Sequence, residues 1–442
     1  MRFAIVVAML VGPGVALGAE PAPEDTRPCG WAEGLEAGPR QAPLIEARRA
    51  KCAELEPYRP GLIERQVLAF EKAERPPITQ LNLFGVYPRL QAIDHRSQSA
   101  AGVRLWRPDL GSSPLDLAGS AFWSIQGFQY YEAQLGMMPH RGRAFPVFAH
   151  KTDDVFELVN VRYDDDKPFM LYGGLAHRWA PKFDFFGSGP SSRKEDQAGF
   201  SQRDTLVEGV TGYRVVPRVT LSGRFGFYRA ATGPGEDEKL PQLTDVFDPA
   251  VVPGLGERVD FLRYGAGAVF DARDVAGNPH RGGLLAVQWL RYDQRDGRAF
   301  TFDRYAVDGR AFISLGDPQR VLALRAYASQ DDPKGGARVP FYLLPFLGGS
   351  HTLRGFLSQR FRGERLALFQ AEYRWEASPA IELALFADSG AVAATRDDKL
   401  EQFRTGGGIG LRLKTHEATL LRFDCAWSDE GVRLLLRFNP SF

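Results

Sequence analysis

The stretch from Phe346 to Val392 places one arginine and two carboxylates where they can form ion pairs. Arg354 lies in a glycine-rich loop, and Glu372 and Asp388 lie within the two alternating runs that follow it. Because residues two apart share one face of a strand, both acids fall on the polar faces of their runs. A guanidinium binds a carboxylate through two parallel hydrogen bonds. If these faces line a lumen, we predict that Arg354 folds inward and pairs with both acids. The alternative is an exposed loop arginine without a partner.

No other set of residues has the spacing of a known catalytic or metal site. The histidines are scattered at positions 95, 140, 150, 177, 280, 351 and 416. No His-Glu-x-x-His, Gly-x-Ser-x-Gly or phosphate-binding loop occurs. Ser350 and His351 are adjacent, but adjacency alone does not create a catalytic geometry. The acidic run 164–166 favours a solvated turn over a cation site. We therefore predict a protein that is not an enzyme and has no catalytic residues, metal or cofactor.

The residues around Arg354 resemble motifs of the BamA/TamA outer-membrane barrel superfamily, the bacterial surface antigen family. HTLRGF (351–356) is similar to the family's Val/Ile-Arg-Gly-Phe/Tyr loop, with leucine in place of Val or Ile. LALFADSGAV (383–392) is similar to its Phe-x-Asp-x-Gly strand. The resemblance extends to VFDARDVAGNPHRGG (269–283) and FFGSGPSS (185–192), and covers most of residues 97–442. It implies a loop that reaches into the lumen, with these residues at the site: Leu353, Arg354, Gly355, Phe356, Glu372, Asp388 and Gly390.

Alternation of apolar and polar residues predicts an all-β fold, a 16-stranded antiparallel transmembrane β-barrel with a short N-terminal helical segment. The stretch 340–347 is counted as part of a long loop. The predicted strands are 97–107, 115–125, 127–138, 154–164, 168–186, 203–216, 218–230, 258–271, 282–292, 299–314, 319–330, 364–376, 380–392, 402–414, 417–427 and 430–442.

The predicted connections alternate between short turns and long loops, which is typical of bacterial outer-membrane barrels with turns in the periplasm and loops outside. The long links are 139–153, 187–202, 231–257, 331–363 and 393–401. The link 272–281 falls on the turn side. The predicted short turns are 126–127, 165–166, 216–217, 316–317, 378–379 and 415–416.

Composition and charge placement agree with a membrane barrel. The chain has 47 Gly, 31 Phe and 14 Tyr, as many amphipathic strands and turns require. No apolar run after residue 20 reaches the roughly 18 residues of a membrane helix. Arg433 and Arg437 alternate with apolar residues in the last strand and would be costly against lipid, so they are expected to face the lumen. A soluble β-sandwich, the alternative fold, would place such charges outside. The net charge of +1 gives no reason to expect a nucleic-acid partner.

The N-terminal part divides into two predicted segments ahead of the barrel at 81–442. Residues 1–18 have a basic start, an apolar run and a small-residue end, which indicates a cleaved signal peptide, with a membrane anchor as the alternative. Residues 19–80 are a periplasmic or lumenal segment with a helix at 61–74 that could plug the lumen, dock at the rim or act as a linker. Export would allow a disulfide between Cys29 and Cys52, the alternative being two free thiols. Cys425 is expected to pack on the lipid side.

The resemblance implies a protein of the bacterial outer membrane that helps proteins or lipids to enter or cross that membrane. Its partners would be outer-membrane lipid, a client protein and the barrel assembly machinery, with Phe438 and Phe442 as the C-terminal assembly signal. In the family, activity depends on a weak seam, which would here join 97–107 to 430–442 and be loosened by Gly102 and Gly431. The alternative is a passive channel or structural barrel. Residues 19–80 lack the length and strand pattern of a POTRA domain, which favours that alternative.

Overall fold

The fold was analysed in a computed structural model of the chain. The structure describes residues 84–138 apart from 92, 95, 98 and 99, then 168–414 and 419–437, and the single positions 46, 50, 61 and 65. The chain divides into two compact units, residues 1–65 and 66–442. In the first unit, the amide of Arg65 donates to the carbonyl of Gly61 over 2.8 Å. Among the described residues, no helix is long and apolar enough to span a membrane.

The second unit is dominated by one antiparallel sheet of 16 strands, as predicted. Each strand pairs with its neighbours in sequence, except that β11 pairs with β14 because the short β12 (Phe346–Leu347) and β13 (Phe361–Arg362) pair with each other inside the intervening loop. The sheet strands are β1 Val86–Gln91, β2 Ala100–Arg107, β3 Asp116–Ser124, β4 Gln129–Met137, β5 Phe169–Phe185, β6 Ala198–Val216, β7 Val219–Pro234, β8 Arg258–Asp271, β9 Gly282–Gln294, β10 Phe302–Leu315, β11 Asp317–Pro333, β14 Arg365–Ser378, β15 Ile381–Ala393, β16 Arg404–Lys414, β17 Thr419–Ser428 and β18 Gly431–Arg437.

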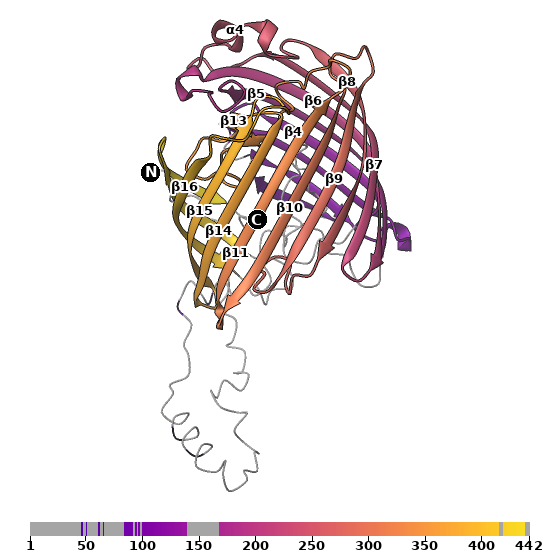
Figure 1. Cartoon of the computed structure of the whole chain (residues 1–442). Helices are drawn as coiled ribbons and strands as arrows, with labels where there is room; N and C mark the ends of the chain where they lie inside the picture. Colours follow the sequence, from indigo (N-terminus) through magenta and orange to yellow (C-terminus); the bar gives the residue numbers. More distant parts are fainter. Residues whose placement is uncertain are drawn as a thin grey trace. The chain divides into compact units, whose positions relative to one another are not determined.

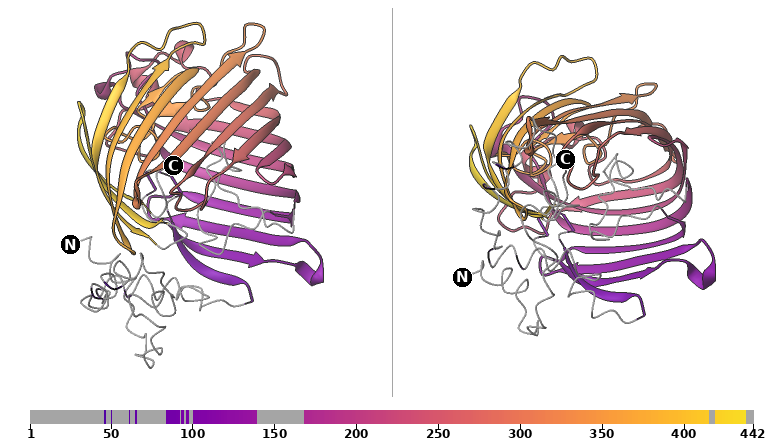
Figure 2. Two further views of the ribbon diagram at one scale, coloured as in Figure 1. Left: turned by 60° about the horizontal axis from the view of Figure 1, so that its bottom comes forward. Right: turned by 90° about the horizontal axis from the view of Figure 1, so that it is seen from below.

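The strands follow one another around a tilted barrel wall in sequence order (Figure 1). Seen from below, the wall runs round a ring from the indigo β1 and β2 through β7 to β11 and on to the yellow β16 to β18 (Figure 2). The first and last strands, β1 and β18, are the two edges of the sheet. Short helical turns lie in the connections: η3 Leu110–Ser112, η4 Lys194–Asp196, α4 Leu243–Val246 and η5 Pro249–Val251.

The beginning of the barrel differs from the prediction. The first strand is β1, which pairs along its whole length with β2, so the predicted first strand 97–107 is an internal strand. The predicted strand 154–164 lies outside the described residues, and β4 pairs directly with β5, leaving no place for a strand between them in the sheet. The total of 16 was right, but one of its members was misplaced. Pro88, which cannot donate to a ladder, hides β1 in the sequence.

This shift changes which end of the barrel holds the first connections. The turn 125–128 between β3 and β4 was predicted in the periplasm, but Lys182 from the outer end of β5 donates to Gln126 at 3.5 Å. It therefore lies at the same end as the long loop 235–257, whose Glu236 amide donates to Pro181. The end of β4 at Met137 and the start of β5 at Phe169 consequently lie at the opposite, turn-bearing end. From β5 onward, the predicted alternation of turns and loops matches the strand order.

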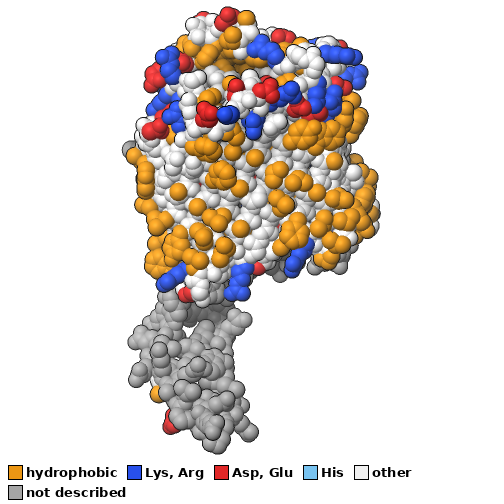
Figure 3. Space-filling view, in the orientation of Figure 1, with side chains coloured by type: hydrophobic (Ala, Val, Ile, Leu, Met, Phe, Trp, Pro, Cys, Tyr) orange, Lys and Arg blue, Asp and Glu red, His pale blue; other side chains and the backbone are white. Residues whose placement is uncertain are grey.

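The two faces of the sheet differ in chemistry, as alternation predicts. Outward side chains such as Phe225, Phe369 and Leu385 are exposed, whereas Arg412 and Asp424 face inward and are buried. In the space-filling view, apolar side chains cover the wall between a broad charged band above and a few charged residues below (Figure 3). This is the arrangement expected of a transmembrane barrel. The lipid-side prediction for Cys425 agrees with its position on the outward face between Phe423 and Trp427.

An aromatic cluster fills the loop-bearing end of the barrel. Phe341, in the loop between β11 and β12, packs against Phe185 and Phe200 with ring centroids 5.1 and 4.9 Å apart. The amide of Phe341 donates to Pro253 in the loop 235–257, which joins the two loops. Burial raises the pKa of the neighbouring Tyr342, and the nearby acids Glu257 and Asp204 add to that rise. We call this cluster the aromatic cap; its fully buried members are Phe122, Phe128, Phe185, Phe200, Phe261, Phe302 and Phe341.

Candidate functional site

The candidate site is built by the loop 334–364, which folds back into the barrel. The pairing of Phe346 with Arg362 and of Leu347 with Phe361 closes the loop at its base. Leu353 and Phe356 are fully buried and belong to a cluster that also contains residues of β14 and β15. The apolar residues beside Arg354 therefore fasten the tip of the loop to the wall. Further members of this cluster are Leu347, Phe361, Leu366, Leu368 and Val392.

Arg354 lies at the centre of a fully buried ion-pair network. Its Nε and Nη2 donate to the two carboxylate oxygens of Asp388 at 2.7 and 2.6 Å, and its Nη1 donates to Glu372 at 2.5 Å. Its backbone amide also donates to Asp388 at 3.0 Å. The structure thus brings together all three residues of the predicted ion pair, and none of them is exposed to solvent.

Residues before and after Asp388 in β15 also contact this loop. Phe386 places its ring 3.6 Å beneath the guanidinium of Arg354, which adds a cation–π contact. At Gly390, a Cβ atom would lie 2.7 Å from Leu347, so glycine lets the loop approach the strand. Gly355 has a φ of 94°, in the region that favours glycine, and it lies against the backbone of Trp427. Each glycine of the two motifs therefore has a steric reason.

The network continues through residues that the sequence reasoning did not connect to it. Glu372 also accepts from Arg374 at 3.0 Å and from Arg412 at 2.9 Å. Arg412 in turn donates to Glu382 at 3.0 Å, and Asp424 lies 3.9 Å from Arg354. These residues occupy inward positions of β14 to β17. The sequence signal available was that each of these residues falls on the inward face of its strand. The register between strands was also needed to predict that they lie next to one another.

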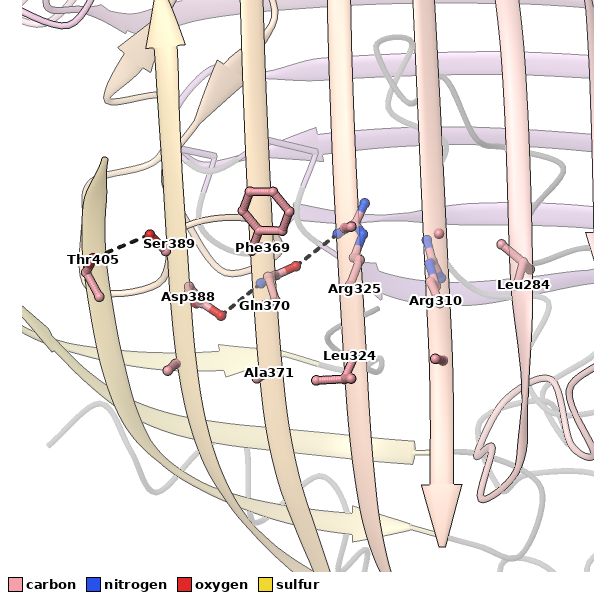
Figure 4. Close-up of a pocket in the computed structure, with 14 residues that line it drawn as sticks. Leu284, Arg310, Leu324, Arg325, Phe369, Gln370, Ala371, Asp388, Ser389 and Thr405 are labelled. Carbon is pink, nitrogen blue, oxygen red and sulfur yellow. Dashed lines mark hydrogen bonds between the residues drawn. The ribbon is translucent and has the colours of Figure 1, made fainter. Parts of the chain in front are cut away.

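A second branch joins the network to β10 and β11. Gln370 donates to Asp388 at 3.1 Å and accepts from Arg325 at 3.2 Å (Figure 4). Arg325 also donates to Asp308 at 2.8 Å. Leu284, Arg310, Arg325, Gln370 and Asp388 contribute to the lining of a pocket of about 630 Å³. Ser389 and Thr405, 3.5 Å apart in the same view, lie on the outward face.

The loop also holds the last hairpin, β17 and β18. Ser350 accepts from Arg422 through its carbonyl at 2.7 Å and from Arg437 through its hydroxyl at 2.8 Å. The hydroxyl of Ser428 donates to the carbonyl of Gly355 at 3.0 Å. Ser350 is therefore a structural residue of the loop that contacts both strands of the last hairpin.

A further contact ties this hairpin to the loops at the outer end. Arg360 donates to Glu430 at 2.7 Å and to the hydroxyl and carbonyl of Ser192, each at 3.0 Å. Lys194 donates to the carbonyl of Glu430 at 3.2 Å. Ser192 ends the FFGSGPSS motif, whose Gly189 amide donates to Arg362 at 2.7 Å. The motif thus connects the loop between β5 and β6 with the loop 334–364.

The DARD motif makes a local structure at the opposite end. Arg273 binds Asp271 through two bonds of 2.9 and 2.7 Å and donates to the carbonyl of Ala276 at 3.0 Å. The turn that follows reaches β14, because His280 lies 2.8 Å from Glu376. Arg273 therefore pairs locally, within the segment VFDARDVAGNPHRGG (269–283).

Several predicted site residues lie outside the described part of the chain. They are Cys29, Cys52, Phe438 and Phe442, together with the signal peptide, the acidic run 164–166 and nearly all of the helix 61–74. Within the described ranges, no group of three or more His, Cys, Asp or Glu residues is arranged to hold a metal ion. Cys425 is a free cysteine.

Comparison with protein families identifies the part of the chain that carries these contacts. Residues 241–439, from the loop before β8 to the end of β18, match the Omp85 superfamily domain. This chain carries an Omp85 superfamily domain. The resemblance to BamA/TamA-type barrels predicted from the sequence motifs is thereby confirmed. The Omp85 domain includes Arg354, Glu372 and Asp388, whereas the strands β1 to β7 precede the matched residues. A search of curated proteins finds no match.

Comparison with solved structures finds a similar fold in other proteins. The crystal structure of BamA from Haemophilus ducreyi lacking POTRA domains 1–3 is 14% identical, with a TM-score of 0.55, and the match covers 79% of this chain and 68% of that one. CdiB from Escherichia coli is 12% identical with a TM-score of 0.47, covering 81% of this chain and 61% of that one. At this identity, the match to BamA shows a shared fold and no more.

Proposed function

We propose that this Omp85 protein is an integral barrel of the bacterial outer membrane that inserts or translocates client proteins there. The observation that carries the proposal is the buried Arg354 network, which fastens a lumenal loop to β14, β15 and the last hairpin. No reaction needs these ion pairs. A buried pair of this kind fixes a loop and a strand register, so its role is to control the shape of the wall.

The edges of the sheet supply the second support. β1 and β18 each have one hydrogen-bonded neighbour within the described sheet. An unpaired strand edge is a template for another strand, and lipid cannot satisfy such an edge. A client strand added between β1 and β18 would satisfy both edges. The proposed seam therefore lies between these strands, and the earlier choice of 97–107 as its first strand is corrected to Val86–Gln91.

The proposed partners follow from this role. The apolar wall meets outer-membrane lipid, the seam meets the client protein, and the barrel assembly machinery would insert this chain itself. We propose no enzymatic activity, because the charged side chains of the Arg354 network are engaged in structural ion pairs. Translocation of a lipid instead of a protein uses the same seam and is a variant of the same proposal.

A passive channel or structural barrel is the alternative. The polar lumen favours it, since inward pairs such as Arg104 with Glu132, 2.8 Å apart, line the wall away from the loop. The aromatic cap opposes it, because buried rings close the loop-bearing end against water and ions. A channel would need the cap to open while the seam stays closed.

The test measures client insertion and conductance side by side in liposomes. Cys425 is first changed to serine, and single cysteines are then placed in Val86–Gln91 and Gly431–Arg437 at pairs with Cα atoms within about 7 Å. An insertase should lose client insertion on oxidation and regain it on reduction. Insertion that persists in the crosslinked protein would contradict opening of the seam. Conductance in both redox states, without client insertion at any stage, would establish the channel instead.

A further inference from the structure

A group of three arginines lies on the outward face of the barrel, on neighbouring strands at the loop-bearing end. Arg203 of β6, Arg229 of β7 and Arg258 of β8 are all exposed. The register places Arg203 and Arg258 level with Ala231 on the strand between them, and Arg229 stands two residues away on that same strand. Strands lie about 4.8 Å apart, so the backbones of Arg203 and Arg258 lie about 10 Å apart, on either side of the small side chain of Ala231.

The charges of this group are only partly neutralised. Arg229 binds Asp260 through two bonds of 2.6 and 2.7 Å. Within the described residues, Arg203 and Arg258 have no carboxylate partner. Arg203 instead lies over the ring of Trp179, with its guanidinium 4.7 Å from the ring centroid. Asp260 interacts with the charges of both Arg229 and Arg258, and Asp296 is a second carboxylate near Arg229, so three arginines and two carboxylates leave one positive charge at the site.

The surroundings locate the group at the upper boundary of the apolar wall. The register row next to Arg229 holds Leu175, Val207, Phe227 and Leu262, all outward and apolar. Arg229 lies two residues, about 6.6 Å, from this row, and Arg203 and Arg258 lie four residues, about 13 Å, from it, so the group occupies the depth of the headgroups above the hydrocarbon region. Long arginine side chains extend their heads toward the interface at such positions. The charged band above the apolar wall in Figure 3 has the same placement.

Aromatic and polar side chains continue the site on β3 to β6. Trp123 donates to the hydroxyl of Tyr131 at 2.9 Å, and Tyr131 lies beside His177 with ring centroids 6.4 Å apart. His177 is 2.7 Å from the hydroxyl of Thr205, which is level with Arg229. Amphipathic rings of this type are suited to the membrane interface, and their hydroxyl and N–H groups suit a sugar.

We propose that this surface binds a phosphorylated glycolipid of the outer leaflet, with the phosphate held by Arg203 and Arg258 and the sugar beside Trp123 and Tyr131. The arginine fork matches the geometry of a phosphate, and the interface weakens competition from water. Asp260 keeps Arg229 in place below them. The inference rests on the proposed location in the outer membrane but does not depend on insertase activity.

The test uses the full chain in detergent and native mass spectrometry to count retained lipid. The probes are bisphosphorylated lipid A, its dephosphorylated form and phosphatidylglycerol. The double variant R203Q/R258Q leaves the Arg229–Asp260 pair intact. The matched control R193Q/R365Q removes the same charge at the same end of the barrel, where Arg193 pairs with Asp196 and Arg365 donates to two backbone carbonyls. Heat-modifiable migration shows that each variant is folded.

We expect wild type and the control to retain lipid A, and the double variant to bind it at least about tenfold more weakly, as loss of one charge-assisted contact predicts. Dephosphorylated lipid A and phosphatidylglycerol should bind more weakly than lipid A to wild type. Equal binding of lipid A by the double variant would overturn the site. Equal binding of the dephosphorylated form would overturn recognition of phosphate, and equal binding of phosphatidylglycerol would overturn the glycolipid. A failure of client insertion alone would leave these measurements unaffected.

Discussion

The two edges of the sheet are held in different ways. The last hairpin is fastened along its inner face, by Ser350 and Gly355 of the loop and, at its outer end, by Arg360. In the first hairpin, Arg96 of the connection between β1 and β2 binds Asp184 and Asp237, and Arg104 of β2 binds Glu132, but none of the bonds described for this hairpin reaches the loop 334–364. If the seam opens, this difference indicates that the β1 side moves more easily than the β18 side. If the edge at β18 stays fixed, a client strand that pairs with it would keep a constant register.

The largest expected effect comes from removing the last residue of the sequence. Deletion of Phe442, the terminal aromatic that resembles an assembly signal, should leave export intact but prevent almost all accumulation in the outer membrane. Cell fractionation with immunoblotting measures this. The matched control is Phe84→Ala, which removes an exposed aromatic side chain just before β1. This variant should accumulate in the outer membrane as the wild type does. Normal membrane levels of the shortened protein would show that the signal lies elsewhere.

The next effect concerns the anchor of the loop. Arg354→Ala leaves Asp388 and Glu372 buried without their shared partner, and breaking a buried ion pair costs about 3–5 kcal/mol. The barrel should therefore unfold at a lower temperature in heat-modifiable electrophoresis, with the last hairpin exchanging amide hydrogens first. Arg354→Lys keeps the positive charge but loses the two parallel hydrogen bonds to Asp388. Its stability should therefore fall between that of the wild type and that of the alanine variant. Wild-type unfolding of the alanine variant would refute the role of the network.

A paired substitution tests the difference between the edges directly. Arg96→Gln should loosen the first hairpin and raise amide exchange in β1 and β2 about tenfold, as expected for a loss of about 1.4 kcal/mol. Arg360→Gln should leave exchange in β17 and β18 much less changed, because Ser350 and Gly355 still hold that hairpin. Equal exchange at both edges in the two variants would show that the loop does not fix the last hairpin.

The smallest expected effect removes one hydroxyl group of the fixed edge. Ser428→Ala deletes the hydroxyl that donates to Gly355 and that also accepts from the amide of Glu430. The cost should be about 0.5–1.5 kcal/mol, within the range of a single neutral hydrogen bond. Denaturant titration followed by tryptophan fluorescence measures it. A much larger loss would mean that this hydroxyl stabilises the hairpin beyond its own bond.

The C-terminal part of the fold was predictable because its signals are local. Gln370, Glu372 and Arg374 alternate with Phe369 and Trp375, and the structure places them on opposite faces. The contact of Arg354 with Asp388 was reached through the motif resemblance together with this alternation. Arg412 and Asp424 carry no motif, so their part in the same network depended on strand register, which alternation does not specify.

The N-terminal strands were harder to place because alternation does not distinguish a paired strand from another extended segment. β1 has six residues and contains Pro88, so its pattern is short and interrupted. The run 154–164 alternates, yet β4 pairs with β5 without it. One missed strand and one surplus strand compensate in the total, but together they reverse the side assigned to the turn 125–128. The predicted number of strands was therefore right although the predicted topology was not.

The aromatic cap has a consequence for the order in which the chain folds. Phe185 and Phe341 touch across about 150 residues of sequence, and contacts this distant form late because the intervening chain must close first. The cap joins the ends of β5 and β6 to the loop after β11, so it can assemble only when most of the wall between them is in place. Protection of its loops from a surface protease would therefore mark the completion of the barrel. A protease added outside the cell would therefore report when the barrel has finished folding.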